Sequence, residues 1–317
     1  MRICFIMDPL AGVLIDKDTT FALMLEAQRR GHEVFWAGIL DLFAQGGEAM
    51  VTLRGATVAR KEGDHHRLGD PQDVRLADLD CVFIRKDPPF DATYLYATHL
   101  CELARGKTLL VNDPRGLRDA NEKLYALHFP DLIPRTIVTR DMARARAFVA
   151  ANGGQAIIKP LDGAGGRNVF HLRSDDRNLN ALLEASTDEG RRLAMLQEYL
   201  PEVREGDRRI LLLDGEPLGA ILRVPLAGET RSNIHVGGRV ERHALTARDL
   251  EICRTVAPRL RADGLYFVGL DVIGSRLTEV NVTSPTGIQE LDRLDGHDAT
   301  GRTVSWLEQR VAAIRPS

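Results

Sequence analysis

The feature that most limits the fold of this chain is a series of short, uninterrupted apolar runs in its first third. Strands that lack polar alternation are buried on both faces, which is typical of parallel sheets covered by helices. Asp18 is placed to cap a helix over Thr19–Arg30 that ends at Gly31. The sequence therefore predicts an N-terminal parallel α/β domain over residues 1–121, with only short strands and loops at Ala44–Asp78. Its expected strands are Arg2–Met7, His32–Ala37, Leu79–Ile84 and Thr108–Val111.

The pattern changes after Asn112. Asp113 and Pro114 are typical of a helix start, and we expect one helix from there to about His128 that leads into a second unit. Residues 122–200 are predicted to form a small α+β module. Its expected elements are strands at Ala156–Lys159, Val169–Leu172 and Leu193–Glu198 and a helix at Asn178–Ser186.

Two antiparallel hairpins are predicted in the last third, residues 201–317. One turns at Asp214-Gly215, a dipeptide typical of tight turns, and the other at Gly274-Ser275. The segment Pro225–Arg239 is polar and has no periodicity, so we expect a mobile loop that acts as a lid, with a disordered segment as the alternative. The remaining expected elements are strands at Arg209–Leu213, Leu218–Val224, Leu265–Ile273 and Arg276–Val282 and helices at Ala247–Arg261 and Gly301–Ile314.

Composition excludes several classes of protein. A net charge of -3 gives no electrostatic case for binding nucleic acid or an anionic membrane. No apolar run is long enough to span a bilayer, and Asp8-Pro9 interrupts the apolar N-terminus where a signal peptide would continue. We therefore expect a cytoplasmic protein. The four cysteines are scattered without metal-binding spacing, which favours free core thiols.

A glycine-rich loop lies between two expected strands, with Lys159 just before it and Gly163, Gly165 and Gly166 within it. Glycines let the backbone approach phosphate oxygens closely. The loop has neither the Gly-Lys-Ser/Thr of a Walker A motif nor the spacing of a dinucleotide fingerprint. It predicts a flap over a triphosphate, with a simple hairpin turn as the alternative.

The second hairpin carries three oxygen-bearing side chains. Glu279 and Asn281 share one face of their strand, and the neighbouring strand places Asp271 beside them. Such oxygens suit a hard cation that also binds phosphates, and their apolar neighbours make three solvated surface residues the weaker alternative. The sequence therefore predicts a magnesium site here.

Two further groups fit the same pocket. The segment Gln197, Glu198, Tyr199 and Leu200 ends an apolar strand and is predicted to bind an adenine edge, with Glu198 or Asp207 on the ribose. Several arginines lie on the first hairpin or the expected lid, where they would offset the charge of a transferring phosphoryl group. These candidate catalytic residues are Arg209, Arg223 and Arg231, with Arg239 nearby.

Specific strings then make the chain resemble the prokaryotic glutathione synthetases of the ATP-grasp superfamily over nearly its whole length. Lys123, Lys159 with its flap, the Gln197–Leu200 segment and the acidic hairpin occur in the order of an ATP-grasp domain. The strings are FIMDPL from Phe5, DTTFALMLEAQRRG from Asp18, IRKDPPFD from Ile84, LRDANEKL from Leu117, KPLDGAGG from Lys159, GETR from Gly228, FVGLD from Phe267 and LTEVNVTSPT from Leu277.

The resemblance implies a fold in which a pre-ATP-grasp domain precedes an ATP-grasp fold of two α+β modules. It implies ATP and Mg²⁺, with Mn²⁺ as an alternative, and ligation of γ-glutamylcysteine and glycine through an acyl phosphate in a homotetramer. It implies that Lys123 and Lys159 bind ATP. The dipeptide would meet Arg85 and Lys86 with its carboxylates and Asp18 with its amine, and glycine would meet Ser284 and Thr286.

Departures from the family pattern affect the acceptor site and the lid. Gly287 replaces a larger residue, and the lid is bulkier than the family's loop. The alternatives are another ATP-grasp ligase with a different acceptor and a non-catalytic ATP-binding scaffold.

Overall fold

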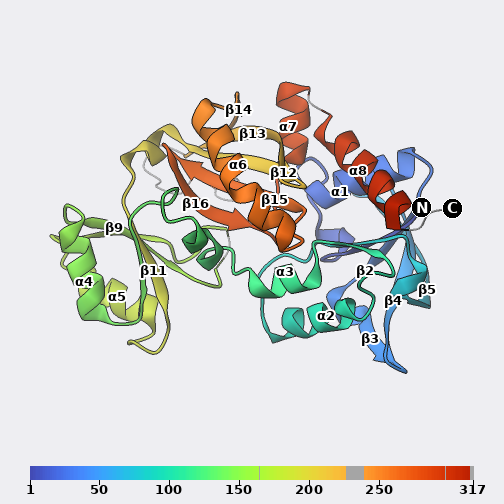
Figure 1. Cartoon of the computed structure of the whole chain (residues 1–317), viewed down its shortest axis with the longest axis horizontal. Helices are drawn as coiled ribbons and strands as arrows, with labels where there is room; N and C mark the ends of the chain where they lie inside the picture. The colour runs from blue at the N-terminus through green and yellow to red at the C-terminus, as the bar shows by residue number, and fades with distance from the viewer. Residues whose placement is uncertain (164, 226–238, 297, 315–317) are drawn as a thin grey trace.

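The computed structural model describes residues 1–163, 165–225, 239–296 and 298–314. Its strands form three sheets, one in each third of the chain. The sheet of the middle third stands apart at one end of the molecule, whereas the sheets of the first and last thirds lie side by side (Figure 1). None of the helices described is long and apolar enough to cross a membrane.

The N-terminal sheet has the strand order β3-β4-β2-β1-β6-β7, with β5 paired to β4. The four strands β2, β1, β6 and β7 are parallel, as the apolar runs predict. The strands are β1 (Arg2–Ile6), β2 (Glu33–Ala37), β3 (Leu42–Gln45), β4 (Glu48–Val58), β5 (His66–Arg75), β6 (Cys81–Ile84) and β7 (Leu109–Val111), and the helices are α1 (Thr19–Arg29) and α2 (Ala92–Glu102).

The prediction of only short strands at Ala44–Asp78 was wrong. Strands β4 and β5 instead form a long antiparallel ribbon. Val51 and Leu53 are buried on one face of β4. Strand β5 is mostly exposed and contains Pro71, so it has neither the apolar content nor the alternation that marks a strand.

The single helix expected from Pro114 to His128 is also wrong, because the chain breaks into α3 (Pro114–Asp119) and a short 3₁₀ helix at Leu124–His128. Asp113 caps α3 by accepting a hydrogen bond from Arg115 N at 2.9 Å. Ala120 then adopts an extended backbone, which ends the helix. The break turns Glu122 toward the last third, where its carboxylate accepts hydrogen bonds from the backbone of residues 282 and 283. Other 3₁₀ helices are Leu10–Gly12, Ile39–Asp41, Leu76–Asp78 and Pro201–Glu205.

The middle module is a four-stranded antiparallel sheet in the order β10-β9-β11-β8. Two helices cover one face and close a small core of their own. The elements are β8 (Thr136–Thr139), α4 (Met142–Ala151), β9 (Gln155–Pro160), β10 (Phe170–Arg173), α5 (Leu179–Thr187) and β11 (Ala194–Glu198).

The C-terminal sheet has the order β14-β13-β12-β15-β16 and contains both predicted hairpins. Asp214 and Gly215 both have positive φ, as the tight turn requires. The lid predicted at Pro225–Arg239 falls outside the described residues except at its two ends. The elements are β12 (Asp207–Leu213), β13 (Glu216–Val224), β14 (Arg239–His243), α6 (Ala247–Ala262), β15 (Phe267–Ile273), β16 (Arg276–Asn281), α7 (Ile288–Asp295) and α8 (Ala299–Ile314).

Two apolar cores run through both the N-terminal and the C-terminal sheets. The first core includes Cys4 and Val282, and the second includes Ile3 and Val311. Each core therefore contains residues of both the first and the last third of the chain. Asn112, at the end of β7, joins the sheets: its Nδ2 donates to Phe267 O at 2.9 Å and its Oδ1 accepts from Phe267 N at 2.7 Å. The first and last thirds of the chain are therefore one packed body.

Candidate active site

A cavity of about 910 Å³ is lined by residues of all three sheets. Every site residue predicted from the sequence lines it, except Lys86, Arg231 and the neighbouring Arg239. Lys86 lies outside the lining, with its ammonium 3.0 Å from the carboxylate of Asp8. Arg231 is outside the described residues. The cavity therefore brings together candidate residues from distant parts of the sequence.

Two lysines converge on one carboxylate at the boundary between the module and the body. Lys123 Nζ lies 3.2 Å from Glu279 Oε1 and donates to Gly163 O at 2.5 Å. Lys159 Nζ lies 4.0 Å from the same carboxylate and donates to Thr278 O at 3.1 Å. Burial opposes ionisation of Glu279, but the two lysines outweigh it and hold the pKa of its carboxyl below the usual value. Burial lowers the pKa of Lys159. The arrangement places two cations beside the glycine loop.

A second buried network surrounds Asp271. Arg209 binds it with two nitrogens, at 2.6 Å and 3.0 Å, and Arg223 Nη2 lies 3.0 Å from its Oδ1. Arg223 is held in turn by Asp207, whose Oδ1 accepts from Nε at 2.5 Å. Burial disfavours the Asp271 anion, but the two arginines outweigh it and hold the pKa of the carboxyl well below its usual range. Paired charges thus fix both guanidinium groups at the cavity wall.

The glycine loop reaches the cavity from between β9 and β10. Gly165 and Gly166 both have positive φ, a backbone conformation that other residues rarely adopt. A Cβ on Gly163 would lie 2.7 Å from Pro160 Cγ, so this position also favours glycine. The loop can therefore present backbone N–H groups close to a ligand.

The end of β11 forms another part of the lining. Gln197 is buried and donates to Thr136 Oγ1 at 3.3 Å, and Glu198 pairs with Arg135 at 2.6 Å. The Tyr199 ring stacks on His171, with the ring centroids 4.1 Å apart. Flat and apolar surfaces beside backbone groups suit a purine base.

The N-terminal domain supplies Arg85, whose side chain is buried. Its Nε donates to Thr20 Oγ1 at 3.1 Å, and its Nη2 donates to Pro285 O at 2.8 Å. Burial lowers the pKa of this guanidinium. Asp18 caps α1 by accepting from Phe21 N at 2.7 Å. This end of the cavity adjoins Ser284 and Thr286 and is chemically distinct from the lysine end.

The donor set for a divalent cation consists of the carboxylates of Asp271 and Glu279 and the amide of Asn281. Strands β15 and β16 pair Asp271 directly with Glu279, and Gly269 with Asn281. The described residues contain no group of three His, Cys, Asp or Glu side chains able to hold a metal ion. The set nevertheless fits Mg²⁺, which takes hard oxygen ligands, few of them from the protein and others from substrate phosphates and water.

Two acidic residues at this site escaped the sequence analysis. Glu122 Oε1 accepts hydrogen bonds from Val282 N at 2.9 Å, Thr283 N at 3.0 Å and Thr283 Oγ1 at 2.8 Å. Glu290 lies in the first turn of α7 and lines the cavity while only 2% exposed. Its signal in the sequence was weak, since only Ile288 and Leu291 beside it mark a buried helical face.

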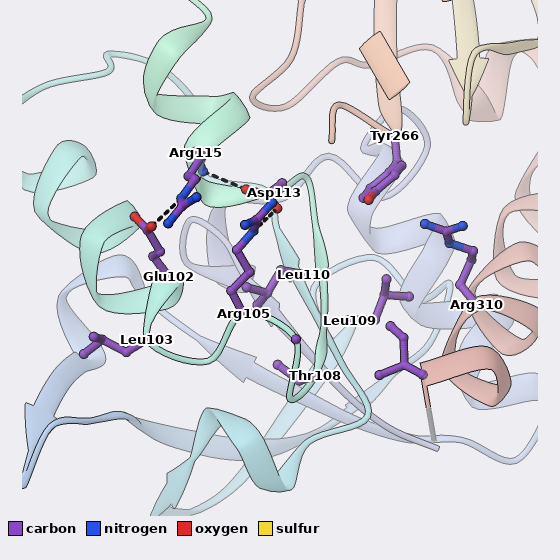
Figure 2. A pocket seen from close by; sticks show the side chains of 12 residues that line it. Glu102, Leu103, Arg105, Thr108, Leu109, Leu110, Asp113, Arg115, Tyr266 and Arg310 are labelled. Carbon is purple, nitrogen blue, oxygen red and sulfur yellow. Dashed lines mark hydrogen bonds and ion pairs between the residues drawn. The ribbon is translucent and has the colours of Figure 1, made fainter. Parts of the chain in front are cut away.

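A second cavity, of about 690 Å³, lies among α2, α3 and α8 (Figure 2). Most of its charged groups are paired: Arg105 pairs with Asp113 at 2.7 Å, and Arg115 with Glu102 (Figure 2). Arg310 lies over the Tyr266 ring, 5.2 Å from its centroid. None of the predicted site residues lines this cavity, so the larger one is the candidate active site.

The chain is similar to known proteins over nearly its whole length. A model of the prokaryotic glutathione synthetase ATP-grasp domain matches residues 122–296, and a model of the N-terminal domain of the same family matches residues 1–118. The glutathione synthetase of Salmonella typhimurium is 46% identical over 314 residues, covering 98% of this chain and 99% of the relative. The glutathione synthetase of Gloeobacter violaceus is 49% identical over 323 residues, covering 100% and 98%.

Solved structures share the fold at low sequence identity. D-cycloserine synthetase DcsG superposes with a TM-score of 0.66 and 16% identity, covering 98% of this chain and 99% of that one. The ATP-grasp ligase PsnB, solved with its precursor peptide PsnA2 and AMPPNP, has a TM-score of 0.63 and 17% identity, covering 98% of each chain. At such identities the likeness establishes the fold alone.

Proposed function

The chain belongs to the prokaryotic glutathione synthetase family, and on that premise we propose how its cavity joins γ-glutamylcysteine to glycine. The family resemblance and the ATP-grasp fold predicted from the sequence are confirmed. The chain is an ATP-dependent C–N ligase, a glutathione synthetase that uses ATP and a divalent metal ion. A different acceptor or a non-catalytic scaffold is not favoured.

The single observation that carries the assignment of roles is that one cavity joins two groups of cations. Lys123 and Lys159 border the glycine loop, and Arg209 and Arg223 are fixed around Asp271. We propose that the lysines and the loop bind the triphosphate, while Gln197, Glu198, Tyr199 and Leu200 bind adenine and Glu198 or Asp207 the ribose.

The metal is proposed to be Mg²⁺, with Mn²⁺ as the alternative, held by Asp271, Glu279 and Asn281. When bound, such an ion neutralises phosphate charge in phosphoryl transfer. Arg209 and Arg223 add charge stabilisation from fixed positions, so little reorganisation is needed during the reaction. Arg231 is proposed to approach from the lid.

The reaction needs no side-chain nucleophile. The cysteinyl carboxylate of γ-glutamylcysteine attacks the γ-phosphorus of ATP, ADP leaves, and an acyl phosphate forms. The glycine amine then attacks the acyl carbon, phosphate leaves, and the amine loses a proton as the peptide bond forms. Closure of the module and lid would keep water away from the acyl phosphate.

The peptide substrates are proposed to occupy the end of the cavity at Arg85. Arg85 would bind a carboxylate of the dipeptide, and Ser284 and Thr286 would meet glycine. Asp18 remains a candidate for an amine and Lys86 for a carboxylate. We propose a matching division of labour, with residues 1–121 binding the peptide, residues 122–200 closing over the nucleotide and residues 201–317 holding the metal.

The test is phosphate release from ATP and Mg²⁺, with γ-glutamylcysteine and glycine added singly and together. We expect release only with both substrates, with glutathione formed in equal amount. Release with a different amine would change the acceptor, and ATP binding without turnover would favour the scaffold.

The assembly stays a prediction from the family resemblance, and the compartment stays a prediction from the apolar pattern of the sequence. We propose a homotetramer in the cytoplasm, which sedimentation velocity and cell fractionation would check.

A further inference from the structure

The strand that carries two of the proposed metal ligands lies at the edge of its sheet. Strand β16 is the last in the order β14-β13-β12-β15-β16, and among the described residues no strand pairs with its outer edge. It contains Glu279 and ends at Asn281. An edge strand lacks, on its outer side, the ladder of hydrogen bonds that fixes an inner strand on both sides. The two ligands therefore keep their positions only if another part of the chain holds this edge.

Glu122 takes the place of a neighbouring strand along that edge. Its carbonyl oxygen accepts a hydrogen bond from Val280 N at 3.0 Å. Its side-chain Oε1 accepts from Val282 N at 2.9 Å. Alternate residues of a strand present their backbone groups to the same edge, so these two contacts lie on either side of Asn281. One residue thus fixes the backbone before and after a proposed metal ligand.

The same carboxylate oxygen also holds the segment that follows β16. It accepts from Thr283 N at 3.0 Å and from Thr283 Oγ1 at 2.8 Å. Thr283 is buried, and a buried donor that loses its partner costs free energy. Glu122 is therefore bound firmly to residues 282 and 283, and its side chain cannot move without releasing them.

The amide of Asn281 is oriented from the opposite side of the strand. Asn281 is paired with Gly269 of β15, and its Nδ2 donates to Gly269 O at 3.2 Å. Because the nitrogen is engaged in this way, Oδ1 is the amide atom available to a cation in the cavity that Asn281 lines. The position of Oδ1 then depends on the backbone of residue 281, which Glu122 holds.

We propose that Glu122 is a positioning residue for the metal site, which holds the backbone around Asn281 so that the amide oxygen reaches the cation. This inference rests on the proposed function and deepens it, because it adds a residue that acts on the cation through one of its ligands. Lys123, the next residue, lies 3.2 Å from Glu279. Two adjacent residues thus act on the two ligands of β16, Lys123 through its charge and Glu122 through hydrogen bonds to the backbone.

The experiment measures the binding of Mn²⁺ to the full-length protein in the presence of ADP, by the loss of the free-ion signal in electron paramagnetic resonance. E122A loses the side-chain hydrogen bonds, so its dissociation constant should rise about tenfold to 100-fold, as is typical when the support of a metal ligand is removed. E122Q keeps an oxygen that accepts from the same donors, so its value should stay within about threefold of the wild type. The matched control E102A removes a glutamate of α2 that accepts from Arg115 and Arg118, and should bind Mn²⁺ like the wild type.

A further variant separates the hydrogen bonds of Glu122 from its charge. E122D keeps the charge but withdraws the oxygen by one methylene, so it should weaken Mn²⁺ binding more than E122Q does. The opposite order would show that Glu122 acts through its charge and would overturn the proposal. The comparison of these two variants decides the matter also where E122A fails to fold.

A double variant tests whether Glu122 acts through Asn281. Once N281A is present, adding E122A should weaken Mn²⁺ binding by less than about twofold, because a positioning residue has no effect without the ligand that it positions. A loss in that background as large as in the wild type would overturn the proposal, as would wild-type Mn²⁺ binding by E122A.

Failure of this inference is distinguishable from failure of the proposed function. If N281A weakens Mn²⁺ binding and E122A does not, only the inference is wrong. If N281A binds Mn²⁺ as tightly as the wild type, the proposed metal site is wrong and the inference is overturned with it.

Discussion

The middle module and the rest of the chain are held together in different ways. The module has one small core formed only by its own residues, including Ile158 and Leu196. The N-terminal and C-terminal sheets share two larger cores, to which Leu270 and Phe5 belong. The module instead meets the body through polar contacts, such as Lys159 Nζ with Thr278 O. A unit with its own core and polar outer contacts can move as a rigid body, which suits a part that closes over a nucleotide.

The largest expected effect is on the body side of the cavity. Asp271→Asn removes the anion between two buried arginines, so glutathione formation should fall about 10²–10³-fold. Removing one partner of a buried ion pair should also cost about 3–5 kcal/mol of stability. Initial rates and urea unfolding measure the two effects, with exposed Asp70→Asn as the control. A variant within tenfold of the wild-type rate would contradict the role given to Asp271.

The two kinds of core can be compared by removing the same atoms from each. Leu196→Ala in the module and Leu270→Ala in a shared core should each cost about 2–5 kcal/mol. Amide hydrogen exchange should then become faster only in β8–β11 for Leu196→Ala. For Leu270→Ala it should become faster in both the N-terminal and the C-terminal sheets. If Leu196→Ala also quickens exchange in β1 and β12, the module is not a separate cooperative unit.

A smaller effect is expected at a contact that joins the middle module to the body. Asn121 Nδ2 donates to Leu161 O at 3.0 Å, while its Oδ1 accepts from Lys123 N and Leu124 N. Asn121→Asp keeps the acceptor and loses the donor. We expect KM for ATP to rise about threefold to tenfold with an almost unchanged unfolding midpoint, because about one hydrogen bond is lost.

The control for that variant is Asn180→Asp, which changes an exposed pair with Arg146 inside the module. Its KM for ATP should equal that of the wild type. Equal KM values for both variants would show that the Leu161 contact does not help to hold the module in place.

The smallest expected effect is a pH-dependent change in the stability of the body, caused by a substitution at Glu26. Hydrogen bonds and ion pairs from Arg29 and Arg30 hold the pKa of Glu26 at about 2, below its usual 4.5. A carboxyl with a lowered pKa stabilises the folded state above the unfolded pKa, and this contribution is lost as pH falls from about 4.5 toward about 2. Glu26→Gln should lower the unfolding midpoint slightly at pH 6 and not at pH 2. Thermal unfolding at the two pH values checks this, and a pH-independent difference would contradict it.

The sequence predicts the strands of this fold best where burial leaves a clear pattern. The apolar runs at Arg2–Met7 and Leu79–Ile84 correspond to the parallel strands β1 and β6, and both predicted hairpin turns are present. The ribbon of β4 and β5 was missed, since its outer strand is exposed on both faces. The break after Asp119 depends on the contact of Glu122 with residues 282 and 283, which local patterns cannot show.

The site residues also divide into those that a sequence pattern marks and those that only the packing of the fold reveals. Motif residues such as Lys159 and Asp271 were found because glycines or paired acids mark them in the sequence. Glu290 has no such mark; only the packing of α7 against α1 turns an ordinary helical glutamate into a buried one. Lys86, next to Arg85, was predicted with it, but adjacent residues of an extended segment point in opposite directions. The roles of all these residues stay proposals.

The shared cores determine the order in which the parts of the chain can fold during synthesis. Strands β1 and β6 leave the ribosome long before β12 and β15, the partners that complete their cores. The middle module can close its own core as soon as β11 has emerged. The second third of the chain is therefore expected to fold before the first. The apolar surface of the first third stays exposed until the last third has emerged, and it needs protection from aggregation during that time.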